Sequence, residues 1–195
     1  MAILGDMEYQ TIVVDPPWSY NNKRTGGSFK SGSEQKYAVL NHNDICDIPI
    51  DSLAARDAHL FLWATSPLLP EAIDVMRFWG FTHKAVIVWE KTGRLGMGFN
   101  FRIQTEFCLY GRRGKAKALR CQSCNLIRAP ARKHSQKPEE FWDLIDPVTP
   151  GPKLELFARD EARVGWDSWG DQCSEPIKLD QLDTWSEGVV TNSPV

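Results

Sequence analysis

The sequence predicts an α/β fold with a mostly parallel sheet flanked by helices. Short apolar runs rich in β-branched and aromatic residues alternate with segments of helical periodicity along most of the 195 residues. This alternation is typical of strand–helix–strand units. The length suits one domain, which we place at residues 1–172. Residues 173–195 are polar, acidic and without periodicity, and we expect a poorly ordered tail there.

The expected strands are short apolar runs bounded by turn residues. They are Thr11–Val14, His59–Ala64, Ala85–Trp89, Phe107–Tyr110, Asn125–Ile127 and Leu154–Ala158. Two segments predict helices. Residues 67–79 carry apolar side chains on one face and stop at a glycine, and residues 138–145 begin with proline. Trp63, Trp79 and Trp89 fall within these patterns, so we expect them in the core.

Composition narrows the class of protein. No apolar run approaches the length of a membrane span, and residues 1–9 lack the features of a secretory signal, so no membrane association is expected. Five cysteines without a repeating spacing argue against a disulfide framework and favour a reducing, cytoplasmic setting. Cys121 and Cys124 form a single CxxC pair, which with Cys108 and His134 would be the only zinc-site candidate. One such pair is weak evidence, and no metal is expected.

Charge is strongly segregated along the chain. Residues 91–133 hold eleven basic residues and a single acid, Glu106, for a net charge of +10. The chain has 23 basic and 25 acidic residues, so 12 basic and 24 acidic residues remain elsewhere, a net charge of −12. A solvated basic loop is the plain alternative, but this asymmetry favours contact with a polyanion. We therefore predict that 91–133 is a nucleic-acid-docking insertion, with Arg112, Arg113, Lys115 and Lys117 as substrate-binding residues.

Asp15-Pro16-Pro17-Trp18 follows directly after the first expected strand, at the end where α/β proteins bind their ligands. The amino nitrogen of adenine is a poor nucleophile because its lone pair is delocalised into the ring. The Asp15 carboxylate and the Pro16 carbonyl could accept hydrogen bonds from both amino hydrogens and free that lone pair. Prolines add no competing N–H and keep the turn rigid. Trp18 offers a flat face for a base, which would first leave a duplex stack. The alternative is a simple strand-terminating turn.

With this motif the sequence resembles the adenine N-6 methyltransferases related to the catalytic subunit of the eukaryotic messenger-RNA methyltransferase, a family with many bacterial and phage members. The resemblance runs from Tyr9 to Gln172. The matching elements, in order, are Asp15–Trp18, Tyr37–Leu40, Leu60–Trp63, His134–Pro138, Leu154–Arg159 and Trp166–Gln172. The closing element has Asp171 where the family usually has asparagine, and the long N-terminal extensions of eukaryotic members are missing.

The resemblance implies a Rossmann-like methyltransferase fold with circularly permuted motif order, in which the catalytic motif comes first and the cofactor strand last. It implies S-adenosylmethionine as cofactor, and Tyr37 as a wall of the adenine pocket. The residues that it implies at the cofactor are Asp15, Lys137, Arg159, Asp171 and Gln172. Without the resemblance, Arg159 would be interpreted as a surface arginine and Lys137 as a lysine at the start of a helix. No phosphate-binding glycine loop follows Arg159, which is consistent with a cofactor that has no phosphate.

Three functions remain open from the sequence. The small single-domain format favours a bacterial or phage enzyme that methylates adenine in DNA. An RNA methyltransferase with the same chemistry is the second reading. The third is a catalytically silent nucleic-acid-binding subunit, against which Asp15 and Trp18 argue, because such a subunit has no use for them. A single subunit, a homodimer and a heterodimer all stay open.

Overall fold

The structure is a computed structural model of the chain. It describes residues 8–19, 39–93, 96, 100–132, 136–159, 163–170, 173, 176–177 and 180–192. Residues 20–38, which follow the Asp15–Trp18 motif, lie outside these residues.

In the described part of the chain, seven strands form one sheet. They are β1 (Tyr9–Val14), β2 (Ala54–Ala64), β3 (Thr82–Thr92), β4 (Thr105–Arg113), β5 (Leu126–Pro130), β6 (Lys153–Leu156) and β7 (Asp167–Trp169), in the spatial order β5-β3-β4-β2-β1-β6-β7. β1 pairs in parallel with β2 and β6, as do β6 with β7 and β3 with β5. β4 is antiparallel to both of its neighbours. The prediction of a mostly parallel sheet is therefore confirmed.

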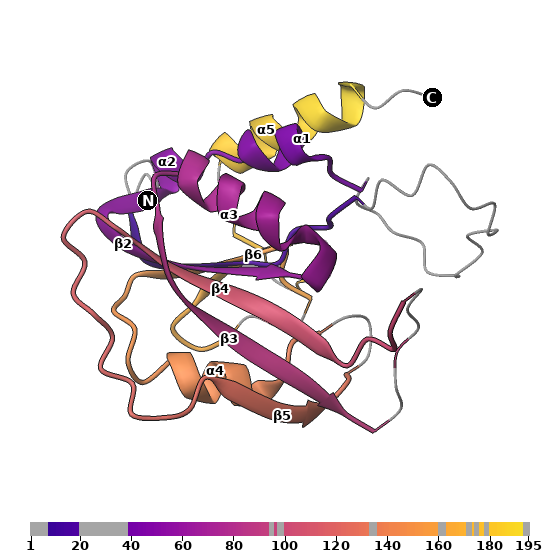
Figure 1. Ribbon diagram of the computed structural model, residues 1–195. Coiled ribbons are helices and arrows are strands. Elements are labelled where there is room, and N and C mark those ends of the chain that lie inside the picture. The colour runs from indigo at the N-terminus through magenta and orange to yellow at the C-terminus, as the bar shows by residue number, and fades with distance from the viewer. Residues whose placement is uncertain are drawn as a thin grey trace.

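Helices cover both faces of the sheet (Figure 1). They are α1 (His42–Cys46), α2 (Ile50–Leu53), α3 (Leu69–Phe78), α4 (Glu139–Ile145), α5 (Asp180–Asn192) and the 3-10 helix η1 (Ser66–Leu68). α1, α2, α3 and α5 pack on one face around Ile12, Val14 and Leu60. α4 packs on the other face, where Phe141 meets Phe61 and Trp63. Alternate residues of β1 and β2 thus supply two separate cores, as the period of two in a strand requires. Trp63, Trp79 and Trp89 are buried, as expected.

β1 lies where the chain path changes direction. After β1 the chain passes α1 and α2 to reach β2 on one side, whereas the strand on the other side, β6, is reached through α4 on the opposite face. Such a switch point leaves a crevice beyond the carboxyl ends of the strands, where α/β sheets bind their ligands. Asp15 follows β1 at this point, and its N–H donates to the carbonyl of Leu156 at the end of β6 (3.4 Å). We call this end of the sheet the catalytic edge.

The C-terminal segment differs from the expected poorly ordered tail. Residues 180–192 form α5, in which Leu182 is fully buried and Trp185 packs edge-to-face against Phe157 and Trp169. Leu182, Trp185 and Val189 stand at i, i+3 and i+7, which is the spacing of one helix face within an otherwise polar segment. Contacts of Trp185 with Phe157, just after β6, and with Trp169 in β7 place this helix against the sheet.

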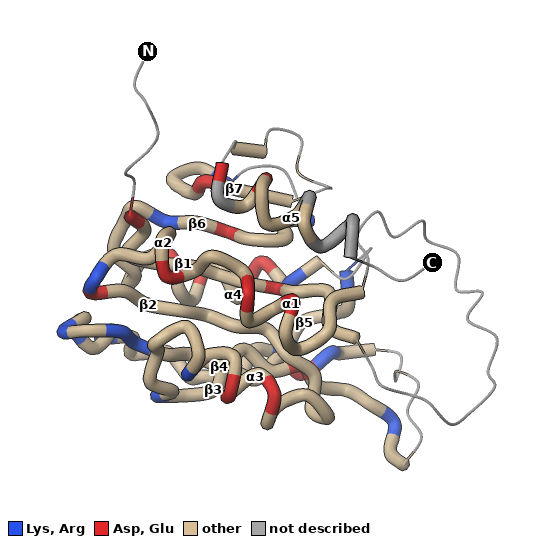
Figure 2. Tube along the Cα trace, turned by 90° about the horizontal axis from the view of Figure 1, so that it is seen from above, with Lys and Arg blue, Asp and Glu red and all other residues tan. Residues whose placement is uncertain are grey.

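The basic segment 91–133 is not an insertion. It contains β4, a central strand of the sheet, and β5 at its edge. Its cations therefore lie in different places. Some surround the catalytic edge, and others gather at the opposite end of the sheet, where β2 begins and β4 ends (Figure 2). β4 crosses the whole sheet, so basic residues before and after it lie at opposite ends of the sheet. A charge count along the sequence does not reveal this separation.

Candidate active site

The Asp15–Trp18 motif is held by backbone hydrogen bonds on both sides. The N–H of Trp18 donates to the carbonyl of Pro16 (2.9 Å), which makes a tight turn. Leu40 lies beside the motif, because its N–H donates to Pro17 and its carbonyl accepts from Ser19 (both 2.9 Å). The chain thus returns to the motif three residues after Tyr37. Tyr37 itself lies outside the described residues.

The indole of Trp18 has a fixed orientation. Its Nε1–H donates to the carbonyl of Trp63 at the end of β2 (2.8 Å), and the half-buried ring packs against the core on the α3 face. A ring fixed at one edge and partly exposed can offer a face to a planar ligand without losing side-chain freedom when the ligand binds.

A chain of alternating charges crosses the catalytic edge. Nζ of Lys137 lies 2.9 Å from Oδ1 of Asp15 and 3.1 Å from Oε2 of Glu106. Glu106, near the start of β4, is also paired with Lys91 on β3. Nε of Arg159, after β6, lies 3.9 Å from Oδ2 of Asp15. The network therefore runs in the order Lys91, Glu106, Lys137, Asp15 and Arg159, with alternating charge. It links β3, β4, β1 and β6.

Burial makes this network strong. The side chains of Lys137, Asp15 and Glu106 are 11%, 19% and 16% exposed, and Nζ of Lys137 lies 4.9 Å above the ring of buried Trp63. Burial alone would lower the pKa of Lys137, but the carboxylates of Asp15 and Glu106 outweigh it and raise that pKa above its ordinary value. Burial would likewise raise the pKa of Glu106, but Lys137 and Lys91 bring it below its ordinary value. Lys137 and Glu106 are therefore both charged at neutral pH.

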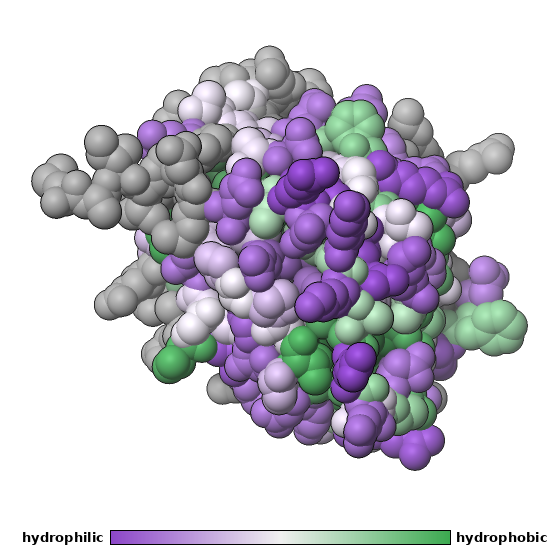
Figure 3. All heavy atoms as spheres, turned by 90° about the vertical axis from the view of Figure 1, so that its left-hand side faces the viewer, coloured by the Kyte–Doolittle hydropathy of each residue, from purple (hydrophilic) through white to green (hydrophobic). Residues whose placement is uncertain are grey.

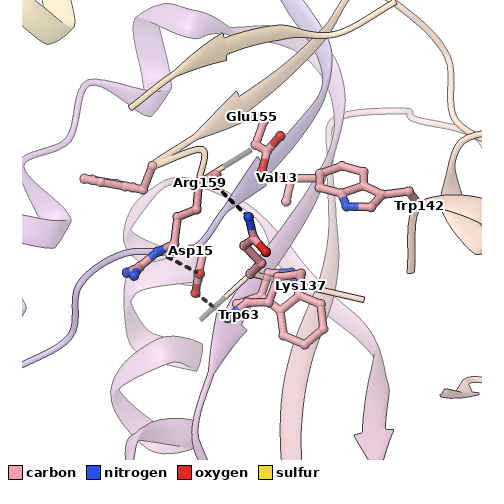
Figure 4. A pocket seen from close by; sticks show the side chains of 9 residues that line it. Val13, Asp15, Trp63, Lys137, Trp142, Glu155 and Arg159 are labelled. Atoms are coloured by element: carbon pink, nitrogen blue, oxygen red, sulfur yellow. Dashed lines mark hydrogen bonds and ion pairs between the residues drawn. The ribbon is translucent and has the colours of Figure 1, made fainter. Parts of the chain in front are cut away.

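A pocket opens next to Asp15, on the α4 side of the sheet (Figure 4). Its walls come from β1, β2, β6, α4 and the segment before α4. They are Val13, Asp15, Trp63, Gln136, Lys137, Trp142, Glu155, Phe157 and Arg159. Carboxylates, cations and flat aromatic rings thus surround the same space. The side-chain amide of Gln136 donates to the carbonyl of Arg159 (3.3 Å) and closes one side.

Three features at this pocket indicate a ligand or close packing. The indole N–H of Trp63 is buried and has no acceptor within the described residues, although such donors nearly always have one. Phe157 has a φ of 62°, a left-handed conformation that is costly for a bulky residue and collects at functional sites. Gly170 approaches the backbone of Ala158 so closely that a Cβ would lie 2.5 Å from it, so the chain before Asp171 passes right beside this strand end.

The structure places Lys137 and Arg159 beside Asp15. Trp18 lies in the same turn as Asp15, with its ring on the α3 face of the sheet. Asp171 and Gln172 lie outside the described residues. The predicted docking residues do not join this group. Arg112 and Arg113 pair with His59 and Ala58, at the end of β2 opposite the catalytic edge, and Lys115 and Lys117 follow them.

Glu106 is the site residue that sequence reasoning missed. It is the single acid in a segment of eleven bases, and that isolation was the available signal. A lone acid among so many cations is expected to form ion pairs with some of them. In the structure, Glu106 forms ion pairs with Lys91 and Lys137. The part of the chain that the structure describes contains no group of three or more metal-ligating side chains. In that part, too, no helix is both long and apolar enough to cross a membrane.

Comparison with known proteins agrees with this geometry. The MT-A70 family profile matches residues 9–172. The type II methyltransferase M.MunI of a Mycoplasma species is 33% identical over 185 residues, which cover 84% of this chain and 77% of that protein. An N(6)-adenosine-methyltransferase MT-A70-like protein of Arabidopsis thaliana is 30% identical, with 88% of this chain and 24% of that protein covered. The human N(6)-adenosine-methyltransferase catalytic subunit METTL3 is 28% identical, with 88% and 29% covered.

The chain thus spans most of the bacterial relative but only about a quarter of the eukaryotic ones. The matched residues include β1 through β7 and every described residue of the charge network. The chain belongs to the MT-A70 family of methyltransferases.

Proposed function

We propose that this protein transfers the methyl group of S-adenosylmethionine to the exocyclic N6 amine of adenine in DNA. The observation that carries the proposal is the setting of Asp15. Its carboxylate lies between Lys137 and Arg159 at the wall of a pocket, and the fixed ring of Trp18 lies three residues further along.

Asp15 would act on the amine as a hydrogen-bond acceptor. Lys137 fixes the position of the carboxylate, so an oxygen can accept one amino hydrogen of the base. The Pro16 carbonyl already accepts from Trp18, but a carbonyl has two lone pairs and can accept the second amino hydrogen. Both bonds favour a tetrahedral nitrogen with a free lone pair. That lone pair would displace the methyl group from the sulfonium, so that the N–C bond forms as the C–S bond breaks and a neutral thioether leaves. The methylated amine would then lose one proton to solvent.

The pocket residues fit S-adenosylmethionine. Bound there, this cofactor would supply an electrophilic methyl group on a sulfonium. The carboxylates of Asp15 and Glu155 and the aromatic rings of Trp142 and Phe157 suit a cationic ligand with an adenine ring. Lys137 and Arg159 also line the pocket and would contact the cofactor. We expect Asp171 and Gln172 to complete the site.

DNA is favoured over RNA by sequence identity. The chain is 33% identical to M.MunI, a type II methyltransferase, and 30% and 28% identical to the adenosine methyltransferases of Arabidopsis thaliana and human. An RNA substrate is the second candidate, supported by the names of those relatives. A catalytically silent subunit is disfavoured because Asp15, Lys137 and Trp18 together make a site with a use only in catalysis.

The test is methyl transfer from labelled S-adenosylmethionine to matched DNA and RNA oligonucleotides of random sequence, single- and double-stranded. We expect label in duplex DNA that contains adenine. Label confined to RNA would move the substrate to the second candidate. No label in any nucleic acid, with the cofactor shown to bind by calorimetric titration, would contradict the activity.

A further inference from the structure

Four exposed cations gather at the end of the sheet opposite the catalytic edge. They are Arg56, at the start of β2, Lys84, in β3, and Lys115 and Lys117, just after β4, and we call them the distal basic cluster. The turn at Gly114 packs against Arg56 and Asp57, because a Cβ there would overlap the carbonyl of Arg56. β4 lies between β2 and β3, so all four residues share one end (Figure 2). Figure 3 shows this end as a mostly hydrophilic face.

These cations differ from those around the catalytic edge. There, four of the described cations pair with acids: Lys91 with Glu106, Arg128 with Glu90, and Arg132 and Arg163 with Glu139. In the distal basic cluster, no side chain forms an ion pair with another described residue. A cation already paired with a carboxylate gains little from a phosphate, whereas an unpaired one releases counterions when it binds.

The acids at this end offset the charge of the cluster only in part. Asp51 is paired with Arg113, whose Nη1 lies 2.6 Å away. Asp57 accepts the backbone N–H of Lys115 at Oδ1 (2.6 Å) and keeps its negative charge, which is smaller than the four positive charges of the cluster. Arg113 itself binds the carbonyls of Ala54 and Ala55 and therefore ties β4 to β2. Arg113 is thus a structural residue and is not counted in the distal basic cluster. Arg56 and Lys84 belong to the cluster, although the charge count of the sequence did not single them out.

We propose that the distal basic cluster binds phosphates of duplex DNA that flanks the target adenine. This inference rests on the proposed function. Asp15 is level with Trp63 in the sheet, whereas Arg113 is level with Ala58 and lies two strands away. With about 3.3 Å per residue and 4.8 Å per strand, and with the length of a lysine side chain added, the two sites lie roughly 25 Å apart. At one phosphate per about 3.4 Å of strand, that is roughly seven base pairs.

The cluster lies at the other end of the sheet and two strands away from Asp15, so a duplex with its target adenine at Asp15 can reach it with only one of its two flanks. Affinity should rise when one flank of a duplex with a single target adenine grows from about four to about ten base pairs. Growth of the other flank should have little effect. The salt slope of binding should become steeper by up to about 0.9 for each additional phosphate that the cluster neutralises.

The experiment measures binding and initial methylation rates for a series of such duplexes. The proteins are the wild type, the quadruple variant R56A/K84A/K115A/K117A and the control variant R77A/R128A, which removes two exposed cations that are already ion-paired. We expect the quadruple variant to lose the flank dependence and up to about 3.6 units of salt slope. It should match the wild type on the shortest duplex and in melting temperature. The control variant should behave as the wild type throughout.

A quadruple variant that retains both the flank dependence and the salt slope would overturn this inference. So would a control variant that loses them equally, because unpaired charge would then have no special role. Either result leaves methylation of the shortest duplex intact, whereas failure of the proposed function would appear as no methylation of any duplex by the wild type.

Discussion

Nζ of Lys137 lies 2.9 Å from Oδ1 of Asp15, and this ion pair joins the segment before α4 to the end of β1. The same ammonium contacts Glu106 on β4, so one side chain holds the Asp15 carboxylate in register with the antiparallel half of the sheet. The position of Asp15 therefore depends on residues more than 90 positions away in the sequence.

Replacement of Lys137 by methionine should impair both catalysis and stability. The side chain is nearly buried, and its loss leaves two carboxylates close together without a cation. Loss of one partner from a buried pair costs about 3–5 kcal/mol. We expect kcat to fall by roughly 100-fold or more, as for other preorganised electrostatic groups. Melting temperature and steady-state kinetics check this, and K153M, at a lysine distant from Asp15, is the control. Unchanged kcat in K137M would contradict the role of the pair.

Glu106 should govern stability in acid. Its folded pKa is below its ordinary value, so its contribution is present above the unfolded pKa of about 4.3 and is lost as pH falls through the folded pKa. Urea unfolding at a series of pH values should show that Glu106→Gln is less stable than the wild type at about pH 7 and that the difference narrows towards about pH 3.

The control for Glu106 is Glu90→Gln, which affects a pair with the 68% exposed Arg128. Such surface pairs contribute at most about 1 kcal/mol, so this variant should lose little stability. Glu106→Gln should also lower kcat while Glu90→Gln does not, because only Glu106 contacts Lys137. A constant gap between Glu106→Gln and the wild type across that pH range would refute the assignment.

The sequence predicted what depends on neighbours along the chain. The apolar run at 11–14 and the prolines that follow it locate the end of β1 and Asp15, and the helix before Gly80 follows from its own periodicity. Glu106 was missed because its role arises from the pairing of β4 with β2 and β3, which no local pattern records. Arg113 and Lys115 looked equivalent in a charge count. In the fold, one ties β4 to β2 and the other is exposed, because strand geometry separates residues so close in sequence.

Replacement of Trp18 should reduce catalysis through loss of a stacking face. Trp18→Ala removes the ring. It should raise the activation free energy by about 1–3 kcal/mol, which lowers kcat/KM by roughly 5- to 150-fold. Trp18→Phe retains an aromatic face but loses the hydrogen bond to the carbonyl of Trp63. Its kcat/KM should therefore lie between that of Trp18→Ala and that of the wild type. Steady-state kinetics and a melting curve check this. Equal activity of Ala and Phe variants would show that the ring does not contact the base.

Arg113 should act on stability and not on nucleic-acid binding. It pairs with Asp51, hydrogen-bonds the carbonyls of Ala54 and Ala55 and stacks over Phe81. Arg113→Ala leaves these carbonyls without their donor, and each such bond to a charged group contributes about 1.5–3 kcal/mol. We expect a clear drop in the free energy of unfolding. The neighbouring Lys115→Ala should leave it unchanged. Similar stability in both variants, with weaker DNA binding in Arg113→Ala, would reverse this assignment.

The central claim is that Asp15 accepts a hydrogen bond from the amine of a target adenine. The most direct test compares the wild type with Asp15→Asn, which has nearly the same shape but an amide that can donate. Duplex DNA is incubated with methyl-labelled S-adenosylmethionine under single-turnover conditions and then digested to nucleosides. The wild type should form N6-methyldeoxyadenosine, and the variant should be slower by at least roughly 100-fold, with cofactor affinity changed far less. Near-equal rates, or label on another base, would contradict the account.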